Sequence, residues 1–149
     1  MEVGHHVESY RIWDVISQWG RETLQHEIIL ARVIAKAVIR DGLRVQSVDP
    51  RWKTRGTFEL HGAPFVGYVA RDGASPIFIR SSALKHLINI VEHAAIPDQQ
   101  ALFDECVTRQ DFKAWLEHAE LSLPSFWFSV AEQNRVVDAK PAAYQNTLN

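Results

Sequence analysis

The segment of residues 28–39 most constrains how this chain folds, because its side chains are apolar on nearly every side of a helix. Only Arg32 and Lys36 interrupt it, and at helical spacing both lie on one narrow strip. A helix of this kind is buried over most of its circumference, so we expect it at the centre of the fold. We predict that it extends over residues 22–40 and ends before Gly42, which suits a left-handed cap.

Further helices are predicted on both sides of this segment. Residues 10–19 carry an apolar stripe after Ser9, a typical cap residue, and residues 82–95 carry another after a serine pair. A short helix is expected after Pro97, with Cys106 on its inward face. Thr108 then begins a capping box for the helix that follows, which places Trp115 on its apolar side. The pattern therefore predicts about five helices.

A change of pattern after residue 50 predicts strands. Residues 57–61, 64–70 and 76–80 are rich in Val, Ile, Phe and Tyr and are separated by turn residues. This spacing is typical of an antiparallel meander, which needs a helix over one face to persist. We therefore predict an α+β, predominantly helical fold: about five helices around a long central helix, with a small three-stranded antiparallel meander. Residues 1–149 are expected to form one domain, with a flexible polar tail from about residue 133.

Composition narrows the class of protein. The chain is 46% hydrophobic, which supplies a core without disulfides, and it holds one cysteine, Cys106. A single cysteine excludes an internal disulfide and is typical of a reducing cytosol, so we expect a cytoplasmic protein without a membrane span. The compact chain also suggests a bacterial-type protein.

Motifs for catalysis or metal binding are absent from the sequence. The seven histidines form no His-Glu-x-x-His pattern, and one cysteine cannot supply a thiolate cluster. There is no Gly-x-Ser-x-Gly, and the glycines are scattered rather than clustered before a helix. We therefore predict no catalytic residues, no metal site and no cofactor, and we interpret Cys106 as a small buried hydrophobic side chain.

Basic residues gather in one part of the chain. Residues 31–60 hold seven basic and three acidic residues, whereas the net charge of the chain is −2. Cations beside an aromatic ring can hold a phosphate backbone and stack on a base. A nucleic-acid contact is therefore one hypothesis for the loop of residues 44–55, through Arg44, Arg51, Trp52, Lys53 and Arg55. In the alternative interpretation, these side chains dock the loop onto the core or form a solvated face.

An aromatic segment follows the last predicted helix. In an extended chain its three adjacent aromatic residues would not all point one way, and at least one would face outward or across an interface. The alternative is that the segment folds back and seals the core. The candidate interface residues are Leu123, Phe126, Trp127 and Phe128.

These observations favour a non-enzymatic protein-interaction or regulatory module that self-associates as a homodimer. One alternative is a nucleic-acid-associated regulator that binds through the basic loop. A second is a small enzyme or ligand-binding domain, with a pocket between the meander and the helix of residues 82–95. The residues expected to line that pocket are His61, Tyr68, Arg80, Ser82 and His86.

Overall fold

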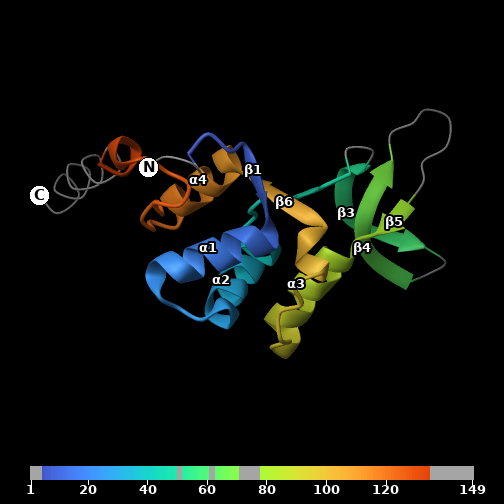
Figure 1. Cartoon of the computed structure of the whole chain (residues 1–149). Helices are drawn as coiled ribbons and strands as arrows, with labels where there is room; N and C mark the ends of the chain where they lie inside the picture. Colours follow the sequence, from blue (N-terminus) through green and yellow to red (C-terminus); the bar gives the residue numbers. More distant parts are fainter. Residues whose placement is uncertain (1–4, 50–51, 61–62, 71–77, 135–149) are drawn as a thin grey trace, which may run out of the picture.

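A computed structural model describes residues 5–49, 52–60, 63–70 and 78–134 (Figure 1). The element order is β1 (Ser9–Arg11), α1 (Ile12–Thr23), α2 (Glu27–Ile39), β2 (Gln46–Ser47), β3 (Trp52–Leu60), β4 (Ala63–Ala70), β5 (Phe78–Arg80), α3 (Ser82–His93), the 3-10 helix η1 (Ala101–Phe103), β6 (Glu105–Thr108) and α4 (Arg109–His118). The predicted class is confirmed: the fold is α+β and predominantly helical. The tail predicted from residue 133 lies almost wholly outside the described residues.

Helix α2 forms the centre of the helical body, as its apolar sequence predicts. It packs against α1 and α3, and Arg32 and Lys36 are exposed on its remaining strip. Its 13 residues make it one residue longer than α1 or α3, and the predicted range of 22–40 began too early, because residues 22–23 belong to α1 and α2 begins at Glu27. The side chains that α2 buries are Leu30, Ala31, Ile34, Ala35, Ala37 and Val38.

The helix predicted over residues 22–40 is interrupted between the end of α1 and the start of α2. Leu24 adopts a left-handed conformation (φ 57°), and the Gln25 amide donates to the Gly20 carbonyl over 3.0 Å. His26 then starts α2, because its Nδ1 accepts a hydrogen bond from the Ile28 amide at 3.1 Å. Gly20 lies inside α1, where a Cβ atom would approach the Gln25 carbonyl to 3.0 Å. A side chain at this position would therefore force the Gln25 carbonyl to move by a few tenths of an ångström.

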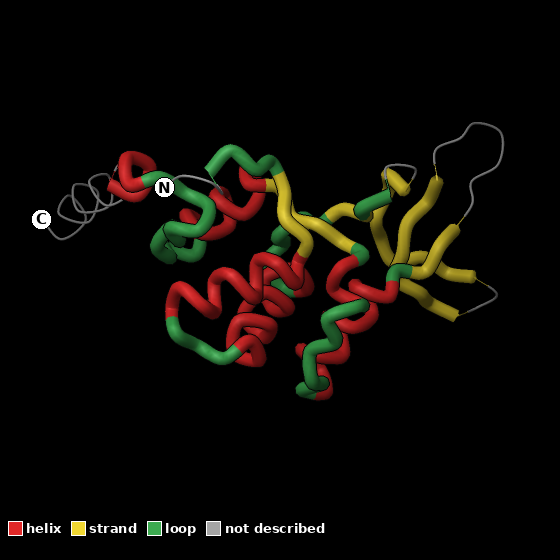
Figure 2. The backbone as a smooth tube through the Cα atoms, in the orientation of Figure 1, coloured by secondary structure: helices red, strands yellow, loops and turns green. Residues whose placement is uncertain are grey.

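The predicted meander is confirmed as a three-stranded antiparallel sheet in the order β3-β4-β5. The backbone in Figure 2 places this sheet on one side of the molecule and α1, α2 and α4 on the other. Strand β3 begins at Trp52, earlier than predicted, because its pairing with β4 continues to Ala70 past an irregularity between Trp52 and Thr54.

A second sheet, absent from the sequence prediction, has the order β1-β6-β2. Ser9 pairs with Thr108 and Gln46 pairs with Cys106, so β6 is the central strand. Ser9 is therefore a strand residue rather than a helix cap, and Arg11 occupies the cap position of α1 without a side-chain hydrogen bond. Cys106 lies half-buried on β6 rather than on an inward helix face. Each of these strands has four residues or fewer, too few for an alternating pattern to be recognised.

The aromatic segment after α4 folds back into the core as a turn. The amides of Trp127 and Phe128 both donate to the Pro124 carbonyl, at 3.3 and 3.0 Å. Trp127 Nε1 donates to the Val7 carbonyl at 2.8 Å, and its ring stacks on Phe112 with centroids 5.5 Å apart. The expectation that adjacent aromatics point apart assumed an extended chain, and the turn removes that condition.

None of the helices in the described part of the chain is both long enough and apolar enough to cross a membrane.

Candidate functional site

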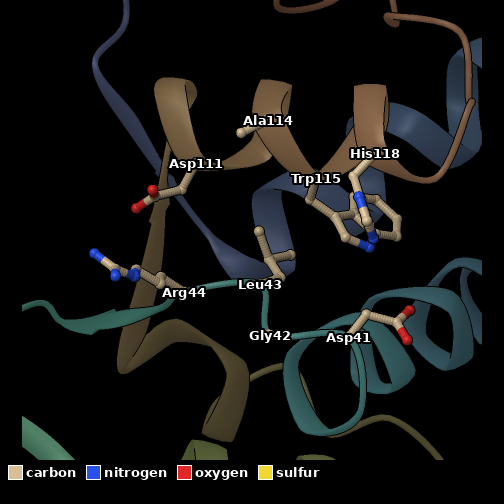
Figure 3. Close-up of a pocket in the computed structure, with 8 residues that line it drawn as sticks. All are labelled: Asp41, Gly42, Leu43, Arg44, Asp111, Ala114, Trp115 and His118. Atoms are coloured by element: carbon tan, nitrogen blue, oxygen red, sulfur yellow. The ribbon is translucent and has the colours of Figure 1, made fainter.

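A pocket of about 240 Å³ lies between α4 and the segment that joins α2 to β2 (Figure 3). One wall is formed by four residues of α4, namely Asp111, Ala114, Trp115 and His118. The facing wall consists of Asp41, Gly42, Leu43 and Arg44. We call this site the α4 pocket.

Helical spacing places the four α4 residues on one face, because positions i, i+3, i+4 and i+7 are neighbours along a helix. The first turn is held by Thr108, whose Oγ1 accepts a hydrogen bond from the Asp111 amide at 3.1 Å. Phe112 and Leu116 are fully buried on the core side of α4. The core thus fixes the rotation of α4 and thereby the direction of the pocket-lining side chains.

The end of α2 shapes the facing wall. Gly42 has a φ of 79°, as its predicted role as a left-handed cap requires. The Leu43 amide returns to the Ala37 carbonyl at 2.9 Å, and the Leu43 side chain is only 2% exposed. Leu43 therefore forms an apolar wall segment, whereas Asp41 and Arg44 on either side of it remain exposed.

The Trp115 indole carries the most informative feature of the pocket. Trp115 is 7% exposed and packs edge-on against Trp19, with ring centroids 6.3 Å apart. Its Nε1 is buried and has no hydrogen-bond partner among the residues that the structure describes. By contrast, Nε1 of Trp127 is satisfied by the Val7 carbonyl. An unsatisfied buried donor costs about 1–3 kcal/mol, and the isolated chain carries this cost at Trp115.

Charged groups of both signs line the α4 pocket. In Figure 3, Trp115 and His118 lie opposite Asp41 at one end, and Asp111 lies opposite Arg44 at the other. Two carboxylates thus face one guanidinium and one imidazole. The described lining contains no serine, cysteine or lysine that would serve as a nucleophile. The lining side chains can donate and accept hydrogen bonds with a bound group.

Comparisons of the chain with models of protein families, with curated proteins and with solved structures gave no match. The site is therefore interpreted from its own geometry. Within the described ranges, no group of three or more His, Cys, Asp and Glu side chains is placed to hold a metal ion.

The basic residues predicted to contact nucleic acid are not gathered on one loop. Arg44 is exposed at the rim of the α4 pocket. The backbones of Trp52, Lys53 and Arg55 belong to strand β3, and Arg51 lies outside the described residues. Because β2 and β3 occupy much of residues 44–55, the predicted loop is wrong as a structural unit. Nucleic-acid binding itself stays a prediction.

The described residues that were expected to line a pocket beside the meander belong to three different elements. His86 Nε2 accepts a hydrogen bond from the Asp98 amide at 2.8 Å, so His86 serves the connection after α3. Ser82 is exposed at the start of that helix. The backbones of Tyr68 and Arg80 lie on β4 and β5, and His61 lies outside the described residues.

Ser81 rather than Ser82 caps α3, and its hydroxyl also contacts a buried acid on β6. Its hydroxyl accepts a hydrogen bond from the Leu84 amide and donates one to Glu105 Oε1, each at 3.0 Å. Glu105 is 1% exposed and lies on β6. Because the serine also caps the helix, this buried contact has a structural role.

The candidate interface residues after α4 belong mostly to the core. Leu123, Trp127 and Phe128 are buried, and Phe126 is half-buried against them. Their burial favours the alternative in which this segment seals the core, because buried side chains leave no surface of their own for a partner.

Sequence reasoning placed Trp115 on the apolar side of α4 but missed the α4 pocket. Helical spacing groups Trp115 with His118 and Asp111. It carries no information on which distant segment faces them, and residues 41–44 reach this position through the end of α2.

Proposed function

We propose that this chain is a non-enzymatic protein-interaction module that binds part of a partner protein in the α4 pocket. The observation that carries the proposal is the buried Nε1–H of Trp115, which lacks an acceptor among the described residues. A partner group that accepts this hydrogen bond converts an energetic cost of the free chain into binding free energy.

The size of the α4 pocket supports a protein partner over a free metabolite. At about 240 Å³ it is smaller than the roughly 300–1,000 Å³ of most small-molecule sites. A single side chain or a short stretch of a partner's backbone fits this volume. The lining also contains Trp115 and Arg44, two residue types that dominate the binding energy of protein interfaces.

We place this function in the cytoplasm, supported by the single cysteine, Cys106, which is typical of chains that fold without disulfides. The homodimer expected from the sequence is one form of the proposal, in which a second copy supplies the bound group. Sedimentation velocity over a range of concentrations distinguishes a homodimer from a module that binds another protein.

The test compares two Trp→Phe variants on an array of short capped peptides. Trp115→Phe removes the Nε1 donor and keeps an aromatic ring. Trp13→Phe makes the same change on α1, away from the residues that line the α4 pocket. We expect some peptides to bind the wild type and Trp13→Phe with similar affinity. The same peptides should bind Trp115→Phe about tenfold more weakly, as the loss of one hydrogen bond predicts. No bound peptide, or equal binding by both variants, would contradict the proposal.

A further inference from the structure

We propose that the α4 pocket is selective for a neutral amide group, such as a peptide backbone unit or an Asn or Gln side chain, over a carboxylate or an ammonium group. This inference rests on the proposed function and names the chemistry of the group that is bound.

The indole of Trp115 sets the first requirement. Its Nε1 is a donor without acceptor capacity, so the bound group must present an acceptor atom. An ammonium group has three donors and no acceptor, and it would leave the buried donor unsatisfied. The 7% exposure of Trp115 means that solvent does little to replace the missing acceptor.

The facing wall sets the second requirement. Asp41 lies opposite Trp115 and His118 in Figure 3 and presents acceptor oxygens. A bound carboxylate placed at Nε1 would therefore face a second carboxylate, and like charges at close range repel. Arg44 lies at the other end of the pocket opposite Asp111, whereas the His118 imidazole lies at the same end as Trp115, so the comparison of probes below is also made in His118→Gln.

An amide meets both requirements in one planar group. Its carbonyl oxygen accepts from Trp115 Nε1, and its N–H donates to the Asp41 carboxylate. Hydrogen bonds to an ionised acceptor are stronger than those between neutral groups, so the contact with Asp41 contributes to affinity as well as to orientation. The apolar side chains of Leu43 and Ala114 complete the lining around such a group.

Four probes of matched size test this selectivity: propionamide, propionate, propylammonium and 1-propanol. The readout is the indole ¹H–¹⁵N NMR signal of Trp115, one of five tryptophan indole signals, identified by its absence in Trp115→Phe. We expect propionamide to shift this signal at the lowest concentration, at least about tenfold below that needed for propionate.

Asp41→Ala is the diagnostic variant, because Asp41 is exposed and its removal leaves the core intact. We expect Asp41→Ala to bind propionamide about tenfold more weakly and propionate more tightly than the wild type does. The preference for propionamide over propionate should therefore narrow or reverse. Glu117→Ala, on an exposed position of α4 outside the pocket lining, should leave the order of the probes unchanged.

Each other outcome overturns the inference. Stronger binding of propionate, propylammonium or 1-propanol assigns the pocket to another chemical group, while a peptide bound through Trp115 still supports the proposed function. No shift with any probe also overturns the amide assignment. The proposed function fails separately, when no peptide distinguishes Trp115→Phe from Trp13→Phe.

Discussion

Arg109, the first residue of α4, forms an ion pair with Glu132 and so ties this helix to the segment that follows the aromatic turn. The Arg109 guanidinium also lies over the ring of Phe128, 4.6 Å from its centroid, and its Nε donates to the Trp127 carbonyl at 3.2 Å. One cation thus joins the helix to three residues of the segment that follows it, namely Trp127, Phe128 and Glu132.

Replacing Glu132 should change the acid stability of the protein. Burial by itself raises the pKa of Glu132, but the hydrogen bonds from Arg109 and Ser129 and the charge of Arg109 outweigh it and lower this pKa to about 2. A lowered folded-state pKa gives stability that is fully present above the unfolded value of 4.5 and is lost as the pH falls toward 2. Glu132→Gln should therefore be less stable than the wild type at neutral pH and should lose less stability on acidification. Urea unfolding from pH 7 to pH 2 measures this difference.

The control for that measurement is Glu117→Gln, which changes an exposed carboxylate on α4, the helix that carries Arg109. It should reproduce the acid transition of the wild type. An identical pH profile for Glu132→Gln and Glu117→Gln would show that the ion pair with Arg109 does not contribute to stability.

Two buried tryptophans should respond differently to the same substitution. Trp127→Phe leaves the Val7 carbonyl without its indole donor, whereas Trp115→Phe removes a donor that has no acceptor among the described residues. Both changes remove similar volume, so their difference reports mainly on the hydrogen bond. We expect Trp127→Phe to lower the free energy of unfolding by about 1–3 kcal/mol more than Trp115→Phe. Chemical denaturation of the two variants measures this, and equal losses would refute the assignment of the unpaired donor.

Leu24 should be replaceable by glycine with a gain in stability. It adopts a left-handed conformation with φ 57°, which disfavours a side chain, and it is 92% exposed, so little packing is lost. After the extra backbone entropy of glycine in the unfolded chain, the expected gain is about 0.5–1 kcal/mol. Thermal unfolding of Leu24→Gly measures it. Ile96→Gly is the matched control, since Ile96 is 80% exposed without a positive φ and should give no gain.

Alanine substitution at Ser81 and at its neighbour Ser82 should lower the free energy of unfolding by very different amounts. Ser81→Ala removes both the cap of α3 and the hydrogen bond to buried Glu105, which should cost roughly 2–3 kcal/mol in unfolding free energy. Ser82→Ala changes an exposed residue in the first turn and should have little effect. Similar losses in both variants would mean that the Ser81 hydroxyl is not the cap.

The long helical segments of this chain were predictable from the sequence, whereas the short strands of the β1-β6-β2 sheet were not. The apolar residues of α2 and the stripe of α3 recur often enough to predict helices, and Thr108 correctly predicts the start of α4. Strands as short as Gln46–Ser47 carry no such period, so the β1-β6-β2 sheet was missed and Ser9 was assigned to a helix. Tertiary pairing rather than local propensity determines these residues.

The α4 pocket was unpredictable for a different reason. Trp115 and His118 share a face by spacing alone, but only tertiary packing places the end of α2, with Asp41, across the α4 pocket from them. The aromatic turn gives a similar lesson, since the buried Trp127 donates a hydrogen bond to Val7, 120 positions away.

The central position of β6 between β1 and β2 has a consequence for how this protein is made. On the ribosome, residues 9–11 and 46–47 emerge long before Glu105–Thr108, the strand with which both pair. The nascent N-terminal half therefore cannot complete the β1-β6-β2 sheet until translation has passed β6, although α1, α2 and α3 precede β6 and can already pack together. Chaperone demand during synthesis should therefore be greatest before residue 108 leaves the exit tunnel and should fall once β6 has docked.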